Sequence, residues 1–317
     1  MSTRTDILKT PGKVVFDPTG TPVTLYSSDG ISLEIIEQLV MLPDVRFGAS
    51  EQIVTGYYVS VKFKPTQFTT AGLAKLFTIN GVRMGGSIVG ATDKIVDIRT
   101  VDGVQRRIAN AYIHQEPAAQ CKTGSTILGE VEIRGIIGLG DEPGTLANFY
   151  VKSNVAWADT GWDPDDEITP GWDVSWSTGS ATAWDAIDTI DGVTVTPKAE
   201  LTEDTSNRNG LVNVTVNGYG VEIAAKTLNI SEELVTAARF NALKPGQKKT
   251  SLGRDFKLRA TTSDAFITCY NAVLQPQSFT FNSKDTVVGD LKWMTSPLVT
   301  SGVKGAHFII QTTDPDA

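Results

Sequence analysis

The sequence predicts a mainly β protein of two tandem β-sandwich or partial-barrel domains, each with one flanking α-helix. Three observations support this fold class: the chain repeats at about half its length, β-branched residues alternate with polar residues in many short segments, and one amphipathic segment recurs at a matched place in each half. The length of 317 residues corresponds to about two typical domains.

The repeat has a nearly constant offset, which takes Pro11 to Pro170 and Val54 to Val216. The matched segments keep their order and their chemical character, which is typical of a conserved set of core and turn residues. They include Asp29–Ile31 with Asp191–Val193, Val54–Tyr57 with Val216–Tyr219, Asn110–Ile113 with Asn271–Leu274, and Ile127–Val131 with Val287–Leu291. We interpret the repeat as a duplicated domain, with the first copy at 1–160 and the second at 161–317.

Most of each copy has the pattern of half-buried antiparallel strands. Residues Val59–Phe63 alternate apolar with polar side chains, as do Val212–Val216 in the second copy. Asp-Gly pairs at Asp29-Gly30 and Asp191-Gly192 are typical turn signals between such strands.

One helix is predicted in each copy. In the second copy Asn229 is suited to cap a helix over 230–243, with Glu232 placed as in a capping box. In the first copy the segment 68–79 has the same apolar spacing, although Gly72 interrupts it.

Each copy also has a long connection between two early strands, at 41–50 and at 202–210. A surface loop is the ordinary interpretation of such a segment. The first connection, however, carries Met41, Leu42, Val45 and Phe47, and exposed apolar side chains of this size favour docking onto a partner.

Several function classes lack the residues they need. The two histidines, His114 and His307, lie far apart, and Cys121 and Cys269 are unmatched between the copies, which favours buried free thiols. No glycine-rich segment has the spacing of a phosphate-binding loop, and no Ser/His/Asp set is evident. We therefore expect no enzyme activity, no catalytic residue, no metal site and no cofactor.

The net charge of −8 argues against a surface that binds nucleic acid by neutralising phosphates. No apolar run reaches the roughly 18 residues of a membrane span, and the first residues lack the apolar region of a signal peptide.

The acidic residues concentrate at the junction between the copies. Between Lys152 and Lys198 there are nine acidic residues and no Lys or Arg. The same stretch, centred on about 153–190, holds five of the six tryptophans, which favours packing between domains or subunits over a free linker. These are Trp157, Trp162, Trp172, Trp176 and Trp184.

The arrangement of strands, long connection, strand, helix and further strands, present twice, resembles the tail tube (major tail) proteins of long-tailed bacteriophages. The resemblance covers both halves and depends on the order of elements. It implies a structural virion protein that forms stacked rings around a hollow tube, with three duplicated chains in each pseudo-hexameric ring.

The resemblance also implies a ring-stacking role for the long connections. By position this role falls on Leu42, Pro43, Val45, Arg46 and Phe47 in the first copy, and on Asp204, Asn207 and Arg208 in the second. The implied partners are further copies of the chain, a tape-measure protein, and the tail terminator and tail-tip proteins. Genomic DNA would pass through the lumen without specific binding, and no membrane is involved. The implied location is the virion tail, assembled in the cytoplasm of the bacterial host.

Two other interpretations remain open. A tandem β-sandwich module could bind a carbohydrate or protein ligand, with the tryptophans as a stacking platform. The chain could also be another component of a tail or injection machine.

Overall fold

The computed structural model describes most of the chain outside the terminal and several connecting segments. The described residues are 12–44, 48–66, 70–82, 84–88, 95–100, 103–122, 125–137, 149–153, 172–177, 184–206, 210–227, 253–260, 266–275, 279–281, 286–288, 291–300 and 303–311. These residues are mainly strands, in two large antiparallel sheets with little helix, which confirms the predicted fold class.

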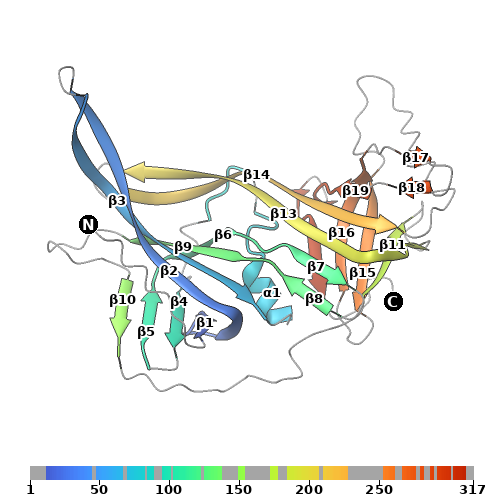
Figure 1. The fold of residues 1–317 in the computed structure, drawn as a ribbon, viewed down its shortest axis with the longest axis horizontal. Helices are drawn as coiled ribbons and strands as arrows, with labels where there is room; N and C mark the ends of the chain where they lie inside the picture. Colours follow the sequence, from blue (N-terminus) through green and yellow to red (C-terminus); the bar gives the residue numbers. More distant parts are fainter. Residues whose placement is uncertain are drawn as a thin grey trace.

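The first sheet has eight strands in the order β10-β5-β4-β1-β2-β3-β9-β6 and lies in the half of the molecule that contains the N-terminus (Figure 1). Its strands are β1 (Gly12–Phe16), β2 (Val23–Asp44), β3 (Gly48–Pro65), β4 (Val96–Thr100), β5 (Gln105–Ile108), β6 (Ala111–Gln115), β9 (Val131–Ile137) and β10 (Phe149–Lys152).

The second sheet has the order β12-β11-β15-β16-β19-β14-β13-β7-β8, and β22 pairs with β16 beside this path. Its strands are β7 (Ala119–Lys122), β8 (Ser125–Leu128), β11 (Trp172–Ser177), β12 (Trp184–Ala186), β13 (Thr189–Ser206), β14 (Gly210–Thr227), β15 (Arg254–Ala260), β16 (Phe266–Leu274), β19 (Leu291–Met294) and β22 (Phe308–Gln311). Two small hairpins complete the described strands: β17 (Phe279–Phe281) with β18 (Thr286–Val288), and β20 (Val299–Thr300) with β21 (Val303–Lys304).

Each half contains one long antiparallel pair, β2–β3 and β13–β14, which we call the first arm and the second arm. The residue pairing of the first arm shifts between Ser27 and Ile31, Gln38 and Leu39, and Leu42 and Pro43. That of the second arm shifts between Thr189 and Val193, Glu200 and Leu201, and Asp204 and Thr205. One constant offset relates all three irregularities, taking Ser27 to Thr189, Gln38 to Glu200 and Leu42 to Asp204. The two arms therefore have the same ladder, that is, the same pattern of residue pairing.

The strands beside the arms correspond as well. Ser60 pairs with Arg134 between β3 and β9, and Glu222 pairs with Met294 between β14 and β19 at nearly the same offset. The boundary predicted at 160/161 lies outside the described residues, so the division into domains stays a prediction. In space the division is not strictly sequential, because β7 and β8 of the first half belong to the second sheet.

The helix predicted over 68–79 is present as α1 (Thr70–Leu76). Leu73 and Leu76 are buried on its inner side, and the ring of Phe77 meets that of Phe308 edge-on at 5.1 Å. α1 therefore contacts the second half through β22. The helix predicted over 230–243 lies outside the described residues.

The long connections predicted at 41–50 and 202–210 are not loops of that length. The strands continue to Asp44 and from Gly48 in the first arm, and to Ser206 and from Gly210 in the second. Cross-strand pairing satisfies the backbone N–H and C=O groups, so two strands can extend without a core beneath them. The register shift at Leu42/Pro43 accommodates proline, which has no N–H for a regular ladder. Figure 1 shows the first arm projecting from the sheet at the left.

Candidate assembly interfaces

The first interface is a strand addition that joins the two halves within the chain. β7 pairs with the outer edge of β13, with Val193 opposite Cys121, Thr194 opposite Gln120 and Val195 opposite Ala119. The side chains of Val193 and Cys121 are buried, so this junction is part of the hydrophobic core. The addition covers an edge of β13 whose N–H and C=O groups would otherwise be unpaired.

Glycine at position 192 permits this close approach. Gly192 has φ +79°, and a Cβ atom there would lie 2.0 Å from the carbonyl oxygen of Cys121. That distance is a clash with the backbone, which a rotamer change cannot relieve. The Asp-Gly pair predicts a turn between strands, but Gly192 lies inside β13, where the pairing with β14 shifts register between Thr189 and Val193. Glycine is therefore required here by the positive φ of this irregularity and by the joint.

The second interface is the packing of the second arm on the first half. Figure 1 shows the arm crossing the molecule near β6 and β9. Val214 and Val216 of β14 are fully buried there. They form a cluster with Ile79, Ile88, Tyr112 and Ile136.

Backbone hydrogen bonds reinforce this packing. The N–H of Gly85 donates to the carbonyl of Val216 at 2.7 Å, and the N–H of Ile88 donates to that of Val214 at 2.8 Å. A short segment of the first half thus pairs with the edge of β14, and the arm is held by main-chain as well as apolar contacts.

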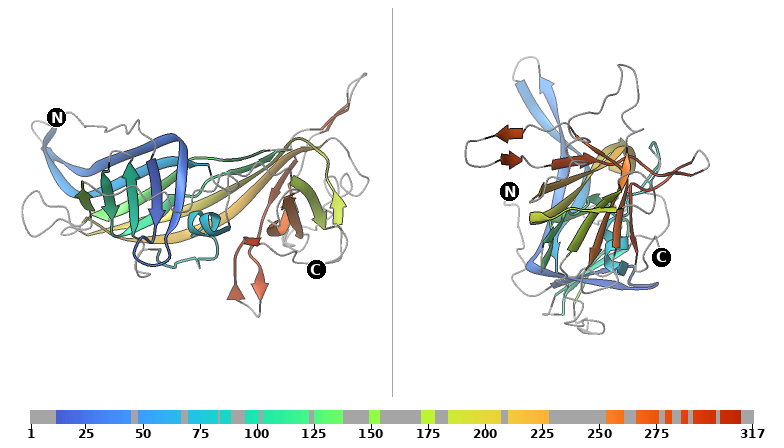
Figure 2. Two further views of the ribbon diagram at one scale, coloured as in Figure 1. Left: turned by 90° about the horizontal axis from the view of Figure 1, so that it is seen from below. Right: turned by 90° about the vertical axis from the view of Figure 1, so that its right-hand side faces the viewer.

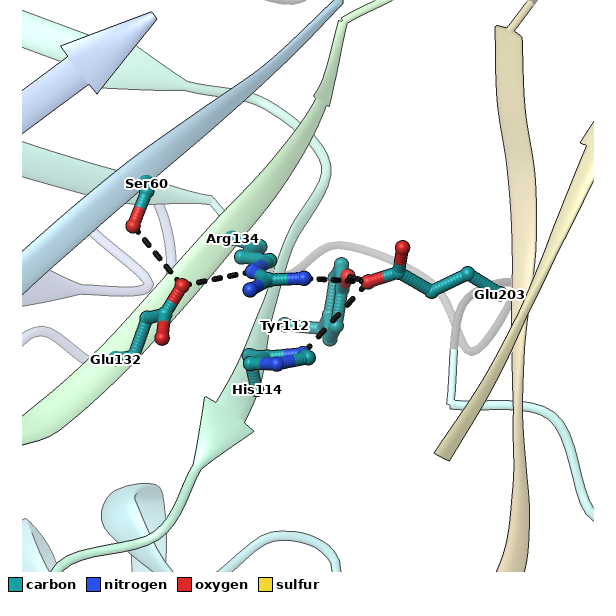
Figure 3. A network of polar contacts seen from close by, with 6 residues as sticks. All are labelled: Ser60, Tyr112, His114, Glu132, Arg134 and Glu203. Atoms are coloured by element: carbon teal, nitrogen blue, oxygen red, sulfur yellow. Dashed lines mark hydrogen bonds and ion pairs between the residues drawn. The ribbon is translucent and has the colours of Figure 1, made fainter. Parts of the chain in front are cut away.

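A polar network lies beside this cluster (Figure 3). Arg134 of β9 donates from Nη1 to Oε1 of Glu203 on β13 at 2.7 Å, and from Nε to Oε1 of Glu132 at 2.7 Å. The hydroxyl of Tyr112 also donates to Oε1 of Glu203, at 3.0 Å. Ser60 donates to Glu132 at 3.0 Å. One guanidinium therefore connects a carboxylate of each half.

The surroundings fix the protonation of this network. Burial would raise the pKa of Glu132, but Arg134 and Ser60 outweigh it and hold the pKa below its ordinary value. Burial, with Arg134 nearby, lowers the pKa of His114, so its ring is neutral at neutral pH and its 3.7 Å approach to Glu203 is not an ion pair there. Burial and Glu203 raise the pKa of Tyr112, which keeps its hydroxyl a donor.

A buried carboxyl forms a third link between the halves. Oε1 of Glu116 accepts from the N–H of Ile79 at 2.7 Å, and Oε2 accepts from the hydroxyl of Tyr219 on β14 at 2.6 Å. Burial raises the pKa of Glu116 to about 7, although the hydrogen bonds from Tyr219 and the Ile79 and Asn80 amides act in the opposite direction.

The first arm differs from the second in what covers it. Toward the tip of the first arm, six large apolar side chains are between 40 and 59 % exposed; they are Ile35, Leu39, Val40, Met41, Ile53 and Val54. At the equivalent place in the second arm Val216 is fully buried and Leu201 packs against the cluster. The same ladder is therefore docked in one half and exposed in the other.

The residues predicted to stack rings are only partly within the described chain. Leu42 lies in β2 opposite Glu51, and Pro43 lies opposite Ala49. Asp204 lies in β13 opposite Asn213, whose side-chain amide donates to it at 3.0 Å. The remaining residues lie outside the described part of the chain: Val45, Arg46, Phe47, Asn207 and Arg208.

Of the five tryptophans predicted to pack between domains or subunits, the structure describes the side chains of two. Trp172 and Trp176 lie in β11 and are buried, and the ring of Trp176 meets Trp293 of the same half at 6.1 Å. This ring contact is within the second half, and both tryptophans belong to the buried cluster that also contains residues of the first half. Such buried rings cannot act as a carbohydrate-stacking platform. Of Trp184 in β12 the structure describes the backbone, and Trp157 and Trp162 lie outside the described residues.

Sequence reasoning missed the residues that join the halves, namely Tyr112, Glu116, Arg134, Glu203 and the β7–β8 hairpin. The available signal is Gly192, whose match with Gly30 by itself predicts only a turn. The prediction of buried free thiols at Cys121 and Cys269 is confirmed.

The described part of the chain contains no group of three or more His, Cys, Asp or Glu side chains arranged to hold a metal ion. No helix within the same residues is long and apolar enough to cross a membrane.

Replacing Gly192 with alanine should loosen the strand addition. The positive φ and the clash with Cys121 should lower the free energy of unfolding by about 2 kcal/mol or more, and amide hydrogen exchange along Ala119–Lys122 should accelerate. Gly220→Ala is the matched control, because a Cβ atom there meets only the Met294 methyl at 3.8 Å. Unchanged amide protection along β7 in Gly192→Ala would contradict the role assigned to this glycine.

Glu116 should make stability depend on pH. Its pKa of about 7 in the folded chain exceeds the unfolded value of about 4.3, so its contribution is largest at low pH and decreases as the pH rises through 7. Glu116→Gln removes this titration. The stability of the unsubstituted chain relative to Glu116→Gln should therefore fall by on the order of 2–3 kcal/mol from pH 5 to pH 8, measured by urea unfolding. The exposed-site variant Glu37→Gln serves as control, and parallel pH profiles for the chain and Glu116→Gln would disprove the assignment.

Comparison of the sequence with protein-family models gives no match, and comparison with curated proteins gives no significantly similar relative.

Proposed function

We propose that the chain is a structural virion protein that assembles into stacked rings and forms the hollow tail tube of a bacteriophage. The observation that carries this proposal is the joint between the halves. Two sheets with the same ladder are connected head to tail within one chain, by strand addition on one side and arm packing on the other.

A head-to-tail joint generates a ring when it is repeated through a rotation that closes. A chain that contains one joint needs only half of the ring contacts to form between separate molecules. Three chains, each with two equivalent halves, would then complete a pseudo-hexameric ring. Joining sheets in this way also leaves no open edge around the ring.

The exposed apolar side chains of the first arm support a second type of contact. An arm with Leu39, Val40 and Ile53 exposed extends beyond its sheet, where no described part of the same chain covers it (Figure 1). Exposed apolar surface of this kind is typical of a protein interface. The tips of both arms would contact the neighbouring ring, as the resemblance to tail tube proteins implies.

This function needs no catalysis and no cofactor. The partners under the proposal are other copies of the chain, the tape-measure protein, and the terminator and tip proteins at the two ends of the tail. DNA would pass through the lumen without specific binding. The location would be the virion tail, after assembly in the bacterial cytoplasm.

Trimming the first arm tests the stacking contact. Met41 and Gln52 lie opposite each other, so replacing residues 42–51 with Asn-Gly should close a regular two-residue hairpin. We expect an unfolding free energy within about 0.5 kcal/mol of the parent chain. We also expect rings to form, while tubes decrease by about tenfold or more, the effect of losing about 1.4 kcal/mol at each contact. Negative-stain electron microscopy measures both.

The corresponding trim of the second arm replaces residues 204–213, between Glu203 and Val214, and should have the same effect on tubes. Full-length tubes from either trimmed chain would refute a stacking role for that arm. A parent chain that remains monomeric at high concentration would refute the proposed function itself.

A further inference from the structure

Two hairpins in the described part of the chain have the same register, and of these β7–β8 is added to a larger sheet while β17–β18 pairs with no other described strand. β7–β8 pairs Ala119 with Leu128, Gln120 with Ile127 and Cys121 with Thr126. β17–β18 pairs Phe279 with Val288, Thr280 with Val287 and Phe281 with Thr286. One offset relates both members of every pair, taking Ala119 to Phe279 and Leu128 to Val288. Among the described strands β17–β18 forms a sheet by itself, at the end of the molecule opposite the tip of the first arm (Figures 1 and 2).

An equivalent acceptor edge is also present. β7–β8 docks on β13 at Val193–Val195, directly after Asp191-Gly192. The matching segment of β2 is Ile31–Leu33, directly after Asp29-Gly30, and Gly30 has φ +92° against +79° for Gly192. β3 pairs with one edge of β2 here, and no described strand pairs with the other.

The surface beside this segment is hollowed on the side of β2 that pairs with β3. An open hollow of about 320 Å³ lies at this position, lined by Asp29–Ser32 of β2, Lys62–Lys64 of β3, and Glu130. In the second half the corresponding approach brings the β7 backbone against Gly192. The acceptor segment of β2 thus has the same backbone form as the occupied one.

We propose that β17–β18 of one chain adds to the Ile31–Leu33 edge of β2 in a second copy, in the register that β7–β8 adopts on β13. Within one chain β17–β18 cannot add to the edge of β13, because β7 occupies that edge. The β2 strand of the same chain lies in the other half of the molecule from β17–β18 (Figure 1). The occupant is therefore a second copy. This contact deepens the proposed function and rests on it, because it is the joint that would close a ring of chains.

The intrachain register defines the residues that meet. Thr194 lies opposite Gln120 within the chain. The offset between the arms takes Thr194 back to Ser32, and the offset between the hairpins takes Gln120 forward to Thr280. Ser32 of one copy therefore lies opposite Thr280 of the other. The same conversion places Ile31 opposite Phe281 and Leu33 opposite Phe279.

The same arrangement brings the first arm of the second copy onto the sheet of β16 and β19, as the second arm lies on β6 and β9. Glu203 of the polar network corresponds to Met41, since the pair Glu203–Val214 and the pair Met41–Gln52 match at the offset between the arms. Arg134 corresponds to Met294, and Tyr112 corresponds to Val273. Tyr112 lies opposite Arg134 in the first sheet, as Val273 lies opposite Met294 in the second.

All three polar positions are therefore apolar in the second set. Met41 is the most exposed of the large apolar side chains along the arm, at 59 %, while Val273 is buried. The charged pair Arg134–Glu203 thus corresponds to the two methionines Met294 and Met41. Both members of the pair differ together, as two complementary surfaces require, because a charge that faces an apolar side chain has no partner. The exposed Met41 thus has a matching surface in the chain, on the half that another copy would bring to it.

Site-directed thiol cross-linking tests the hairpin contact. Full-length Ser32→Cys and Thr280→Cys chains are mixed, oxidised under assembly conditions and separated on a non-reducing gel. We expect a band of two chains in the mixture and none from either variant alone, since Cys121 and Cys269 are buried. Thr194→Cys with Gln120→Cys in one chain is the positive control. It should form a disulfide within the chain and give no band of two chains. Ser153→Cys, at an exposed residue elsewhere, replaces Thr280→Cys as the negative control.

The outcomes separate this contact from the tube itself. Rings or tubes in the microscope without the Ser32–Thr280 cross-link would overturn the hairpin contact and leave the proposed function standing. The cross-link in particles that never stack would support the hairpin contact and count against the tube. A chain that gives neither particles nor cross-link would overturn both.

A charge exchange tests the arm contact independently. Met41→Glu and Met294→Arg should each weaken assembly about tenfold or more, because each places one unpaired charge in the contact. The double variant re-creates the Arg134–Glu203 pair between chains and should recover most of the assembly, measured by sedimentation. Met84→Glu is the matched control for Met41→Glu, since the two methionines are 57 and 59 % exposed. Additive losses in a double variant that unfolds like the parent chain would overturn the proposed register of the arm.

Discussion

The structure depends on one constraint, that the edge of a β-sheet must be covered. The two long arms create long edges, and in the second half the edge of β13 is covered by β7 from the first half. This single strand addition merges the halves into one core, which continues from β1 through β13 to β22. Docking of the second arm follows from it, because β13 is then fixed beside β6 and β9. Among the described strands, the Ile31–Leu33 edge of β2 and the hairpin β17–β18 are two of the places that have no partner strand.

The two arms have the same backbone pairing but different side chains at the contact positions, polar in the second arm and apolar in the first. Within the chain Arg134 connects Glu132 and Glu203, and Tyr112 donates to the same oxygen of Glu203. A partly buried carboxylate with these donors is stable only where the donors are present. Met41 in the equivalent position would leave Arg134 without that partner. The polar joint and the apolar surface are therefore poor substitutes for each other, which keeps the internal joint from exchanging with an external one.

Much of the fold follows from the sequence, because strand patterns and turn glycines are local properties. Alternation at Val59–Phe63 predicts a strand, and the structure has one there. The matched Asp-Gly pairs predict turns between strands, but the structure places them inside β2 and β13, at register shifts, with positive φ at Gly30 and Gly192. The joint does not follow, because Ala119–Leu128 has the same local pattern whether it pairs within its own half or with the other. The choice depends on which edge is open in space. The extension of both arms does not follow for a related reason: residues such as Pro43 and Asp204 have low strand propensity, and cross-strand pairing overrides it.

The internal joint also explains why a duplicated chain can use an apolar external contact. The halves are tethered, so their joint forms at a high effective concentration and can include buried groups that require accurate geometry, such as Glu116 with Tyr219. A contact between separate chains has no such advantage and must also tolerate small errors of approach. Methionine is flexible and unbranched, so surfaces built on Met41 and Met294 can adjust as they meet. An external contact that is apolar and adaptable leaves the charged, geometrically demanding network inside the chain, where it is already assembled before any second copy arrives.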